Sequence, residues 1–211
     1  MVIFPDFVPR LITGMILATM FVSLYVYAPL GLSLMFAGAL VTILVYEWPR
    51  IGIWWITPWY PIAPCLLLIA LNQSPERPLL LFIFILSALF DSAGYFIGST
   101  LGRHKIAPVL SPRKTWEGFI AGMIIAFASA PFLMHFLGMK NLGWWLLPFI
   151  SLYCCLAFSG DLIVSYFKRK VHVKDSSNLL PGHGGLLDRL ASILPTVVYV
   201  YILKSTLMTQ P

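Results

Sequence analysis

The sequence predicts an all-α, polytopic integral membrane protein with about seven transmembrane helices. Of its 211 residues, 59% are hydrophobic and only 10% are charged, whereas soluble domains carry about 25% charged residues. The apolar runs are continuous, as in LLLFIFILSALF at 80–91, and lack the alternating polarity of a transmembrane β-barrel. The whole chain, 1–211, is expected to form one membrane domain.

Each predicted span is about as long as a helix needs to cross roughly 30 Å of hydrocarbon. The first span is expected to be retained rather than cleaved, because its best cleavage candidate, Val26-Tyr27-Ala28, is followed by Pro29. Proline, glycine and polar residues separate the early spans. The predicted spans are 11–28, 30–48, 53–71, 79–100, 117–137, 143–165 and 189–208.

Two long basic connections, 101–116 and 166–188, interrupt this apolar pattern. When successive connections are placed on alternate sides, eleven of the 14 Lys and Arg fall on one side, leaving Arg77, Lys140 and Lys204 on the other. Because cytoplasmic loops are enriched in Lys and Arg, we expect both long loops in the cytoplasm, with the N-terminus inside and the C-terminus outside. This sidedness would invert locally if the proline-rich third span were re-entrant.

The chain has only eight acidic residues, so each can be considered individually. Asp6, Glu47 and Glu76 lie at or near span ends, where contact with solvent is the ordinary expectation. Asp91 and Asp161 lie within apolar spans, where an ionised carboxylate costs several kcal/mol unless it is paired or coordinated. Both are therefore candidate functional residues, with a structural ion pair as the alternative.

The first long loop ends in SPRKTWEG at 111–118, just before the fifth span. Ser111 or Thr115 can cap the following helix. Arg113 and Lys114 beside a helix N-terminus would make an anion site. Ordinary cytoplasmic flanking charge is the alternative.

The second long loop is rich in glycine: three of the four residues 182–185 are glycine and the other is His183. Such a backbone can approach a phosphate closely and present amides to it, and His183 could donate to an anion or bind a metal. Asp188 opens the last span at the depth expected for Asp161. Two carboxylates at one depth suit Mg²⁺, which prefers oxygen ligands and retains waters and substrate phosphates.

Together these segments resemble the motif of the phosphatidate cytidylyltransferases (CDP-diacylglycerol synthases). The similarity covers about residues 88–192, the expected catalytic core, while 1–80 would be variable N-terminal spans of a chain shorter than many bacterial members. One departure is that the family pattern continues Asp-Arg-x-Asp, whereas this chain has Ala191 in the last position. The resemblance rests on Ser165-x-x-Lys168-Arg169, Lys174-Asp175, LPGHGGLLDR at 180–189, DSAGYFIG at 91–98, Gly102-Arg103, SPRKTWEG at 111–118 and Ser159-Gly160-Asp161.

The resemblance implies the reaction CTP + phosphatidate → CDP-diacylglycerol + pyrophosphate, dependent on Mg²⁺ and with room for a second metal or monovalent ion. It implies metal binding by Asp161 and Asp188, with Asp91 as either an additional or an indirect ligand. Lys174, Asp175 and Arg189 complete the implied catalytic set. The implied substrate-binding residues are Ser111, Arg113, Lys114, Thr115, Lys168, Arg169, Gly182, His183, Gly184 and Gly185.

Three alternatives stay open. The chain could be a CTP-dependent membrane enzyme acting on another lipid, such as an ether-lipid cytidylyltransferase or a polyprenol kinase. It could be a transporter of an anionic metabolite, with Asp91 and Asp161 along its path. It could also be a catalytically silent relative, as Ala191 suggests.

On the favoured interpretation, its partners are CTP and membrane phosphatidate, with no nucleic acid and with a homodimer as one option. Its location would be the bacterial cytoplasmic (inner) membrane, with the motif loops facing the cytoplasm.

Overall fold

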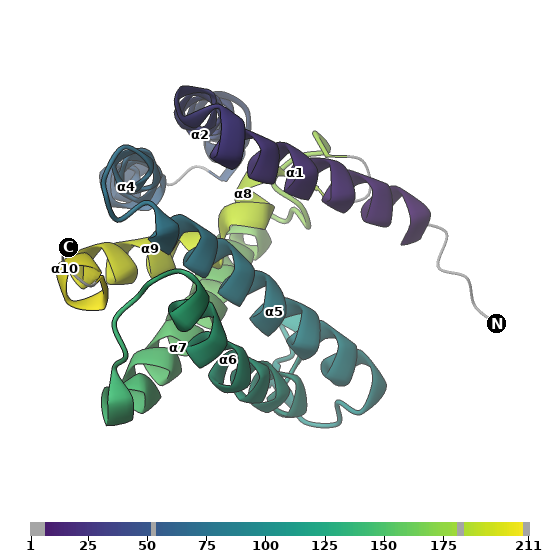
Figure 1. Ribbon diagram of the computed structural model, residues 1–211. Helices are drawn as coiled ribbons and strands as arrows, with labels where there is room; N and C mark the ends of the chain where they lie inside the picture. The colour runs from purple at the N-terminus through teal and green to yellow at the C-terminus, as the bar shows by residue number, and fades with distance from the viewer. Residues whose placement is uncertain (1–6, 52–53, 181–183, 209–211) are drawn as a thin grey trace.

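The computed structural model describes residues 7–51, 54–180 and 184–208, which are mostly helical (Figure 1). Within these residues, four helices are long and apolar enough to cross a membrane, and three further apolar helices are shorter. Each of the seven predicted spans thus has a helical counterpart, and within the described residues four of these counterparts have the length and composition of a membrane span. The long helices are Pro29–Ile51, Pro78–Thr100, Trp116–Phe136 and Gly143–Lys170; the shorter ones are Ile12–Tyr27, Pro58–Asn72 and Ile193–Ile202.

Helices α1 (Phe7–Tyr27) and α2 (Pro29–Thr42) are separated at Ala28 because Pro29 starts the second helix. Helix α2 continues through a π-helical turn, Ile43–Glu47, into α3 (Trp48–Ile51). These elements form one long helix, as the sequence predicted for the second span.

The third predicted span, 53–71, is not one continuous α-helix. A short 3₁₀ turn, Trp54–Ile56, and a π-helical turn, Pro58–Ile62, precede α4 (Ala63–Asn72). The prolines of this stretch explain the break, since proline removes a backbone donor and clashes with the preceding turn.

Helices α5 (Pro78–Thr100) and α6 (Trp116–Phe136) begin where the sequence predicts, at a proline and at a capping threonine. The connection between them is a β-hairpin rather than an irregular loop. Its strands β1 (Lys105–Ala107) and β2 (Ser111–Thr115) pair antiparallel, with Lys105 opposite Thr115. The hairpin fixes where β2 presents its side chains.

Helices α5 and α6 approach each other closely along glycines. A Cβ at Gly118 would lie 2.5 Å from the carbonyl oxygen of Gly94, and one at Gly122 would lie 2.8 Å from that of Phe90. Small residues four positions apart allow helix backbones to meet in this way. The close contact ties the hairpin to the end of α5.

The C-terminal part of the fold begins with a 3₁₀ turn, Gly143–Trp145, and the long helix α7 (Leu146–Lys170). The prediction of one span over 189–208 was wrong, because turns after Leu190 and at Leu203 divide the segment. Its helices are α8 (Leu186–Leu190), α9 (Ile193–Ile202) and α10 (Lys204–Leu207).

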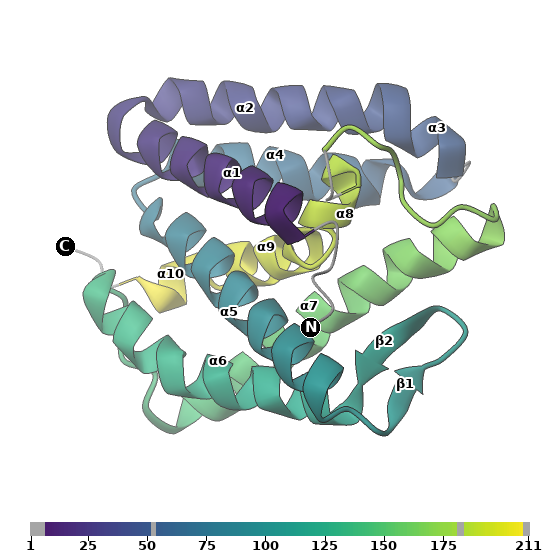
Figure 2. The same cartoon turned by 90° about the vertical axis from the view of Figure 1, so that its right-hand side faces the viewer.

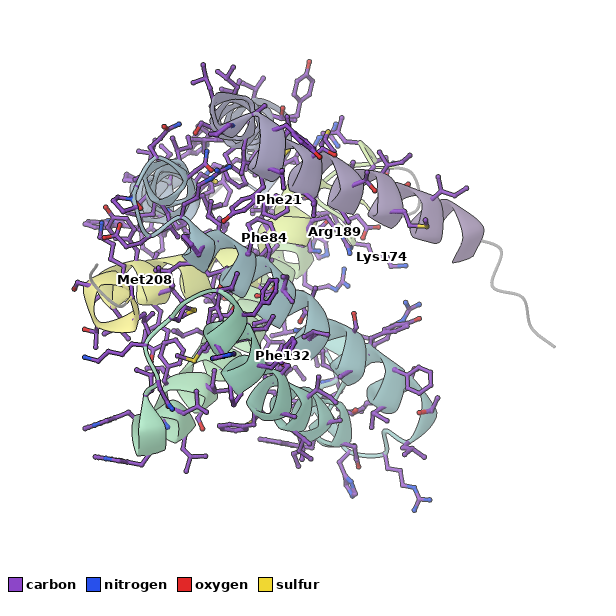
Figure 3. The ribbon with its side chains drawn as sticks, in the orientation of Figure 1. Phe21, Phe84, Phe132, Lys174, Arg189 and Met208 are labelled. Atoms are coloured by element: carbon purple, nitrogen blue, oxygen red, sulfur yellow. The ribbon has the colours of Figure 1, made fainter. Side chains whose placement is uncertain are left out.

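Helix α9 lies in the middle of the molecule, against α4, α5 and α7. Its side chains Leu194, Val197 and Val200 are fully buried. On the other side of α5, the rings of Phe21 and Phe84 stack with centroids 4.4 Å apart (Figure 3). This contact ties α1 to α5.

The connections separate toward two ends of the molecule. The hairpin, the C-terminal end of α7 and helix α3 lie toward the right of Figure 2, while α10 and the α6–α7 connection lie toward its left. Both polar segments singled out in the sequence are therefore at the same end.

Candidate active site

The two polar segments meet at one pocket of about 360 Å³. Helix α5, strand β2, helices α6, α7 and α8, and the α8–α9 turn all contribute to its wall. Apolar contributions include Phe90, Phe119 and Phe158. The polar and charged residues of the wall are Asp91, Tyr95, Ser111, Arg113, Lys114, Thr115, Asp161, Ser165, Lys168, Asp175, Asp188, Arg189 and Ser192.

The first ion pair of the pocket joins the hairpin to α7. Lys114 Nζ donates a hydrogen bond to Asp161 Oδ2 at 2.8 Å. The same ammonium group lies 4.3 Å from the centre of the Phe158 ring, in a cation–π contact. Thr115, directly after Lys114, is 2% exposed and its hydroxyl accepts the Gly118 amide as the cap of α6. The cap and hairpin thus fix the direction in which Lys114 reaches.

The second ion pair joins α7 to α8. Lys168 Nζ donates to Asp188 Oδ1 at 2.5 Å, and the two side chains are only 10% and 6% exposed. The other oxygen, Oδ2, accepts the amides of Ser176 at 2.9 Å and Gly185 at 3.1 Å. Burial acts to raise the pKa of Asp188, but the hydrogen bond and charge of Lys168, with these two amides, outweigh it and hold the pKa below its ordinary value.

A third carboxylate, Asp91 on α5, faces the α8–α9 turn. Its Oδ2 accepts a hydrogen bond from Ser192 Oγ at 3.1 Å. The adjacent Ala191 lines the pocket and is 2% exposed. Its carbonyl oxygen packs so closely on α7 that a Cβ at Gly160 would lie 2.1 Å from it. Because Gly160 has no side chain, the turn that carries Ala191 can pack directly against α7.

Comparisons with known proteins identify the family. The cytidylyltransferase family model matches residues 50–207, about three quarters of the chain. The chain belongs to the cytidylyltransferase family.

Curated relatives resemble the chain over more than half of its length. A phosphatidate cytidylyltransferase of Haemophilus influenzae is 42% identical over 126 residues, which cover 57% of this chain and 43% of that protein. One of Staphylococcus haemolyticus is 42% identical over 124 residues, covering 58% and 47%, and one of Staphylococcus aureus is 39% identical over 123 residues, covering 58% and 47%. The chain spans about half the length of the curated relatives it matches.

Several residues of the family motif lie away from the pocket or outside the described structure. Arg169 donates to the carbonyl oxygen of Val173 at 2.8 Å and does not line the pocket. Lys174 is exposed and also lies outside the pocket wall, although its neighbour Asp175 is part of it. Gly182 and His183 lie outside the described residues.

The amides of Gly184 and Gly185 donate hydrogen bonds to acceptors within the protein. Gly184 N donates to the Leu180 carbonyl oxygen at 3.1 Å, and Gly185 N donates to Asp188. Both described amides are therefore bonded within the protein, and their binding to a phosphate stays a prediction. Leu180 and Gly184 pair as an antiparallel bridge.

The expectation for Glu47 was wrong. This acid at the end of the π-helical turn is 0% exposed, where the sequence suggested a solvated span end. It hydrogen-bonds to the segment that carries Asp188, through Ser176 Oγ and the Leu187 amide among others. The signal in the sequence was its place as the only acid in the apolar helix Pro29–Ile51.

Three carboxylates of the pocket, those of Asp91, Asp161 and Asp188, are the candidate metal ligands. Among the described residues, no group of three or more His, Cys, Asp or Glu side chains is placed to hold an ion. Mg²⁺, however, is usually bound through one or two carboxylates, with waters and substrate phosphates completing its shell. Among the described residues, Asp91, Asp161 and Asp188 therefore form no all-protein metal cage, and a shell completed by waters and substrate would not need one.

Proposed function

We propose that this chain catalyses CTP + phosphatidate → CDP-diacylglycerol + pyrophosphate at a membrane surface. The observation that carries the proposal is the convergence of Lys114–Asp161 and Lys168–Asp188 in one pocket, from segments far apart in the sequence. The names of the curated relatives point to the same reaction. The four apolar helices of spanning length fit a substrate held in a bilayer.

In the proposed reaction, a phosphate oxygen of phosphatidate attacks the α-phosphorus of CTP. A new P–O bond forms as the bond between the α-phosphorus and the β-phosphate oxygen breaks, and pyrophosphate leaves with that electron pair. No protein base is needed, because a phosphate monoester with a second pKa of about 6 is already ionised at neutral pH. The work of the chain is to position two polyanions and offset their repulsion.

The cations of the pocket perform that work. Lys114 and Lys168 are each paired with an aspartate, Asp161 and Asp188 respectively, in the structure without substrate. Phosphate oxygens are strong acceptors for ammonium and guanidinium groups. When a substrate binds, its phosphate oxygens can therefore replace Asp161 and Asp188 as the acceptors for the two lysines. Arg189 on α8 adds a further donor at the pocket wall.

Mg²⁺ is part of the proposal, with Asp161 and Asp188 as its ligands and Asp91 as an additional one. When bound, the ion would neutralise charge on the phosphates and the leaving pyrophosphate. Asp161 is the more accessible carboxylate, because Asp188 has both oxygens engaged by Lys168 and by backbone amides. A second metal or a monovalent ion belongs to the same proposal.

We also propose that the pocket faces the cytoplasm, where CTP is found, from a bacterial inner membrane. Supporting this, the basic hairpin and the basic end of α7 lie at one end of the helices (Figure 2). Seven membrane crossings would follow if the three shorter apolar helices also reach across, with help from their flanking turns.

The test is to incubate the purified protein with phosphatidate in detergent, Mg²⁺ and CTP labelled at the α-phosphate. We expect labelled CDP-diacylglycerol on thin-layer chromatography, and a loss of about 100-fold in kcat for Lys114→Met, as when one charge-stabilising donor is removed. Lys140→Met, at the other end of α6, is the matched control and should keep full activity.

Substrate panels separate the alternatives. Label from the γ-phosphate of CTP in a polyprenol would indicate a kinase, and preference for an ether lipid would indicate a different cytidylyltransferase. No labelled lipid from any of these substrates would refute the enzymatic proposal. Full activity in Asp188→Ala would contradict the assignment of Asp188 as a metal ligand and leave the proposed reaction standing.

A further inference from the structure

Glu47 is a buried acid that the reaction, as described so far, does not use. It is 0% exposed at the end of the π-helical turn Ile43–Glu47. In the described part of the chain, no ion pair includes it. A buried carboxylate is costly unless hydrogen bonds replace its hydration, so its partners show what it does.

Its partners come from the first turn of α8 and from the segment that precedes it. Oε1 accepts Ser177 Oγ at 2.7 Å and the Leu186 amide at 2.8 Å. Oε2 accepts Ser176 Oγ at 3.1 Å and the Leu187 amide at 2.7 Å. Leu186 and Leu187 are the first residues of α8, whose amides have no partner within the helix. One side chain therefore holds both the start of α8 and the serines before it.

Two further contacts connect Glu47 to the pocket. Ser176 Oγ also lies 3.1 Å from Asp188 Oδ2, so one hydroxyl stands between the two carboxylates. Because a hydroxyl has a single proton, it can donate to only one of them at a time. At Gly185, an added Cβ would lie 1.9 Å from Ser176 Oγ and 2.5 Å from Glu47 Oε1. The loop can reach Glu47 only with glycine at this position.

We propose that Glu47 is a positioning residue for the active site: it holds Ser176, Ser177 and the first turn of α8 so that Asp188 stays aligned with Lys168. Glu47 does not touch the pocket and acts through Asp188. It lies outside residues 50–207, the region matched by the family model, so the N-terminal spans contribute to the site through this contact. The expected effects on kcat and Mg²⁺ dependence rest on the proposed function. The expected effect on the order of the loop rests only on the contacts of Glu47.

The chemistry of the four contacts requires a carboxylate. All four partners donate, and a carboxylate offers acceptors on both oxygens. In Glu47→Gln, one oxygen becomes an NH₂ group that faces two donors, while size and shape hardly change. Glu47→Asp keeps the charge but is one methylene shorter, so it cannot reach all four donors.

The first experiment measures activity and loop order in Glu47→Gln. We expect kcat to fall about 10- to 100-fold, the range found when groups that orient site ligands are removed, with a higher Mg²⁺ concentration needed for half-maximal rate. We also expect faster hydrogen exchange of the amides in 176–188. Glu76→Gln, which alters an acid at the α4–α5 turn, is the matched control and should change neither.

A purely structural role predicts a different result. It would lower the amount of folded protein, but leave kcat per folded molecule and the Mg²⁺ dependence unchanged; that outcome would overturn the inference. Ser177→Ala removes one donor without touching Asp188. Its effect and that of Glu47→Gln should be less than additive if both act through the same contact, and full additivity would contradict the proposal.

The two proposals fail in distinguishable ways. Wild-type protein that makes no CDP-diacylglycerol would refute the proposed function, while the exchange of 176–188 would still decide whether Glu47 holds the loop. Active wild-type protein with unchanged kinetics and exchange in Glu47→Gln would refute the positioning role alone.

Discussion

The ion pair of Lys168 and Asp188 shows how this chain keeps charge inside an apolar fold. Both side chains are largely buried, and Asp188 also accepts two backbone amides. A buried pair of this kind contributes little net stability compared with apolar residues of the same volume, but removing one partner leaves the other charge uncompensated. The pair therefore constrains α7 and α8 to one arrangement.

Lys168→Met should lower the free energy of unfolding by about 3 kcal/mol, because it leaves the Asp188 carboxylate buried without its cation. Tryptophan fluorescence during thermal unfolding in detergent would measure this change. Lys170→Met, an exposed residue in the same last turn of α7, is the control and should stay within about 0.5 kcal/mol of the wild type. Equal effects of the two variants would contradict the prediction.

The same ion pair makes the stability of the folded protein depend on pH. The pKa of Asp188 is lower in the folded protein than in the unfolded chain, so the unfolded chain binds the proton first as the pH falls. The stability contributed by this group should be constant from neutral pH to about pH 4 and decline below it. Thermal unfolding at a series of pH values should show a smaller acid-induced loss in Asp188→Asn than in the wild type.

At the residue scale, sequence patterns located the charged groups of the pocket but not all of their partners. Asp161 and Asp91 could be selected because acids are rare in apolar spans, and Thr115 because it precedes a helix. Glu47 was assigned to solvent because it lies beside Trp48 and Pro49 at a span end. Its burial depends on Ser176 to Leu187, some 130 to 140 residues later, and local sequence holds no information on that contact.

The contact between α5 and α6 determines where the hairpin lies. Gly94 and Gly118 meet backbone to backbone, and Gly118 follows the cap of α6 by three residues. Strand β2 ends at the same cap, so a change in the helix contact moves Lys114 as well.

Gly118→Ala should destabilise the protein by about 1–3 kcal/mol, because its Cβ would lie 2.5 Å from a backbone oxygen and the helices must separate. Activity should fall with it as Lys114 shifts away from Asp161. Gly38→Ala is the matched control: it is exposed in α2 and its Cβ would meet nothing within 4 Å. Unfolding temperature and kcat should be measured for both variants. If neither quantity changes in Gly118→Ala, the contact between α5 and α6 is not rigid.

At the element scale, helix starts and proline breaks followed from local signals, whereas the hairpin and the break of the last span did not. Pro78 and Thr115 mark the beginnings of α5 and α6, because a proline and a capping hydroxyl act through their own neighbours. The hairpin at 105–115 was missed because its short strands depend on the helices at both ends. The break of the last span was missed because Ala191 packs against Gly160, a tertiary contact.

The whole molecule has two chemically different ends, and α6 connects them. The hairpin precedes α6 and Lys140 follows it, and these connections lie toward opposite sides of Figure 2. Helix α6 is one of the helices long and apolar enough to cross a bilayer. If it crosses, the hairpin and Lys140 lie on opposite sides of the membrane, whatever the total number of spans.

Accessibility labelling can therefore test the orientation independently of the span count. In a variant whose natural cysteines are replaced by serine, Lys140→Cys should react with a membrane-impermeant maleimide added to intact spheroplasts. Lys105→Cys, in the basic hairpin, should react only after permeabilisation, because positively charged loops are retained in the cytoplasm. The reverse pattern would place the pocket away from cytosolic CTP and contradict the proposed reaction in its membrane setting. Labelling of both sites from outside would show that α6 does not cross.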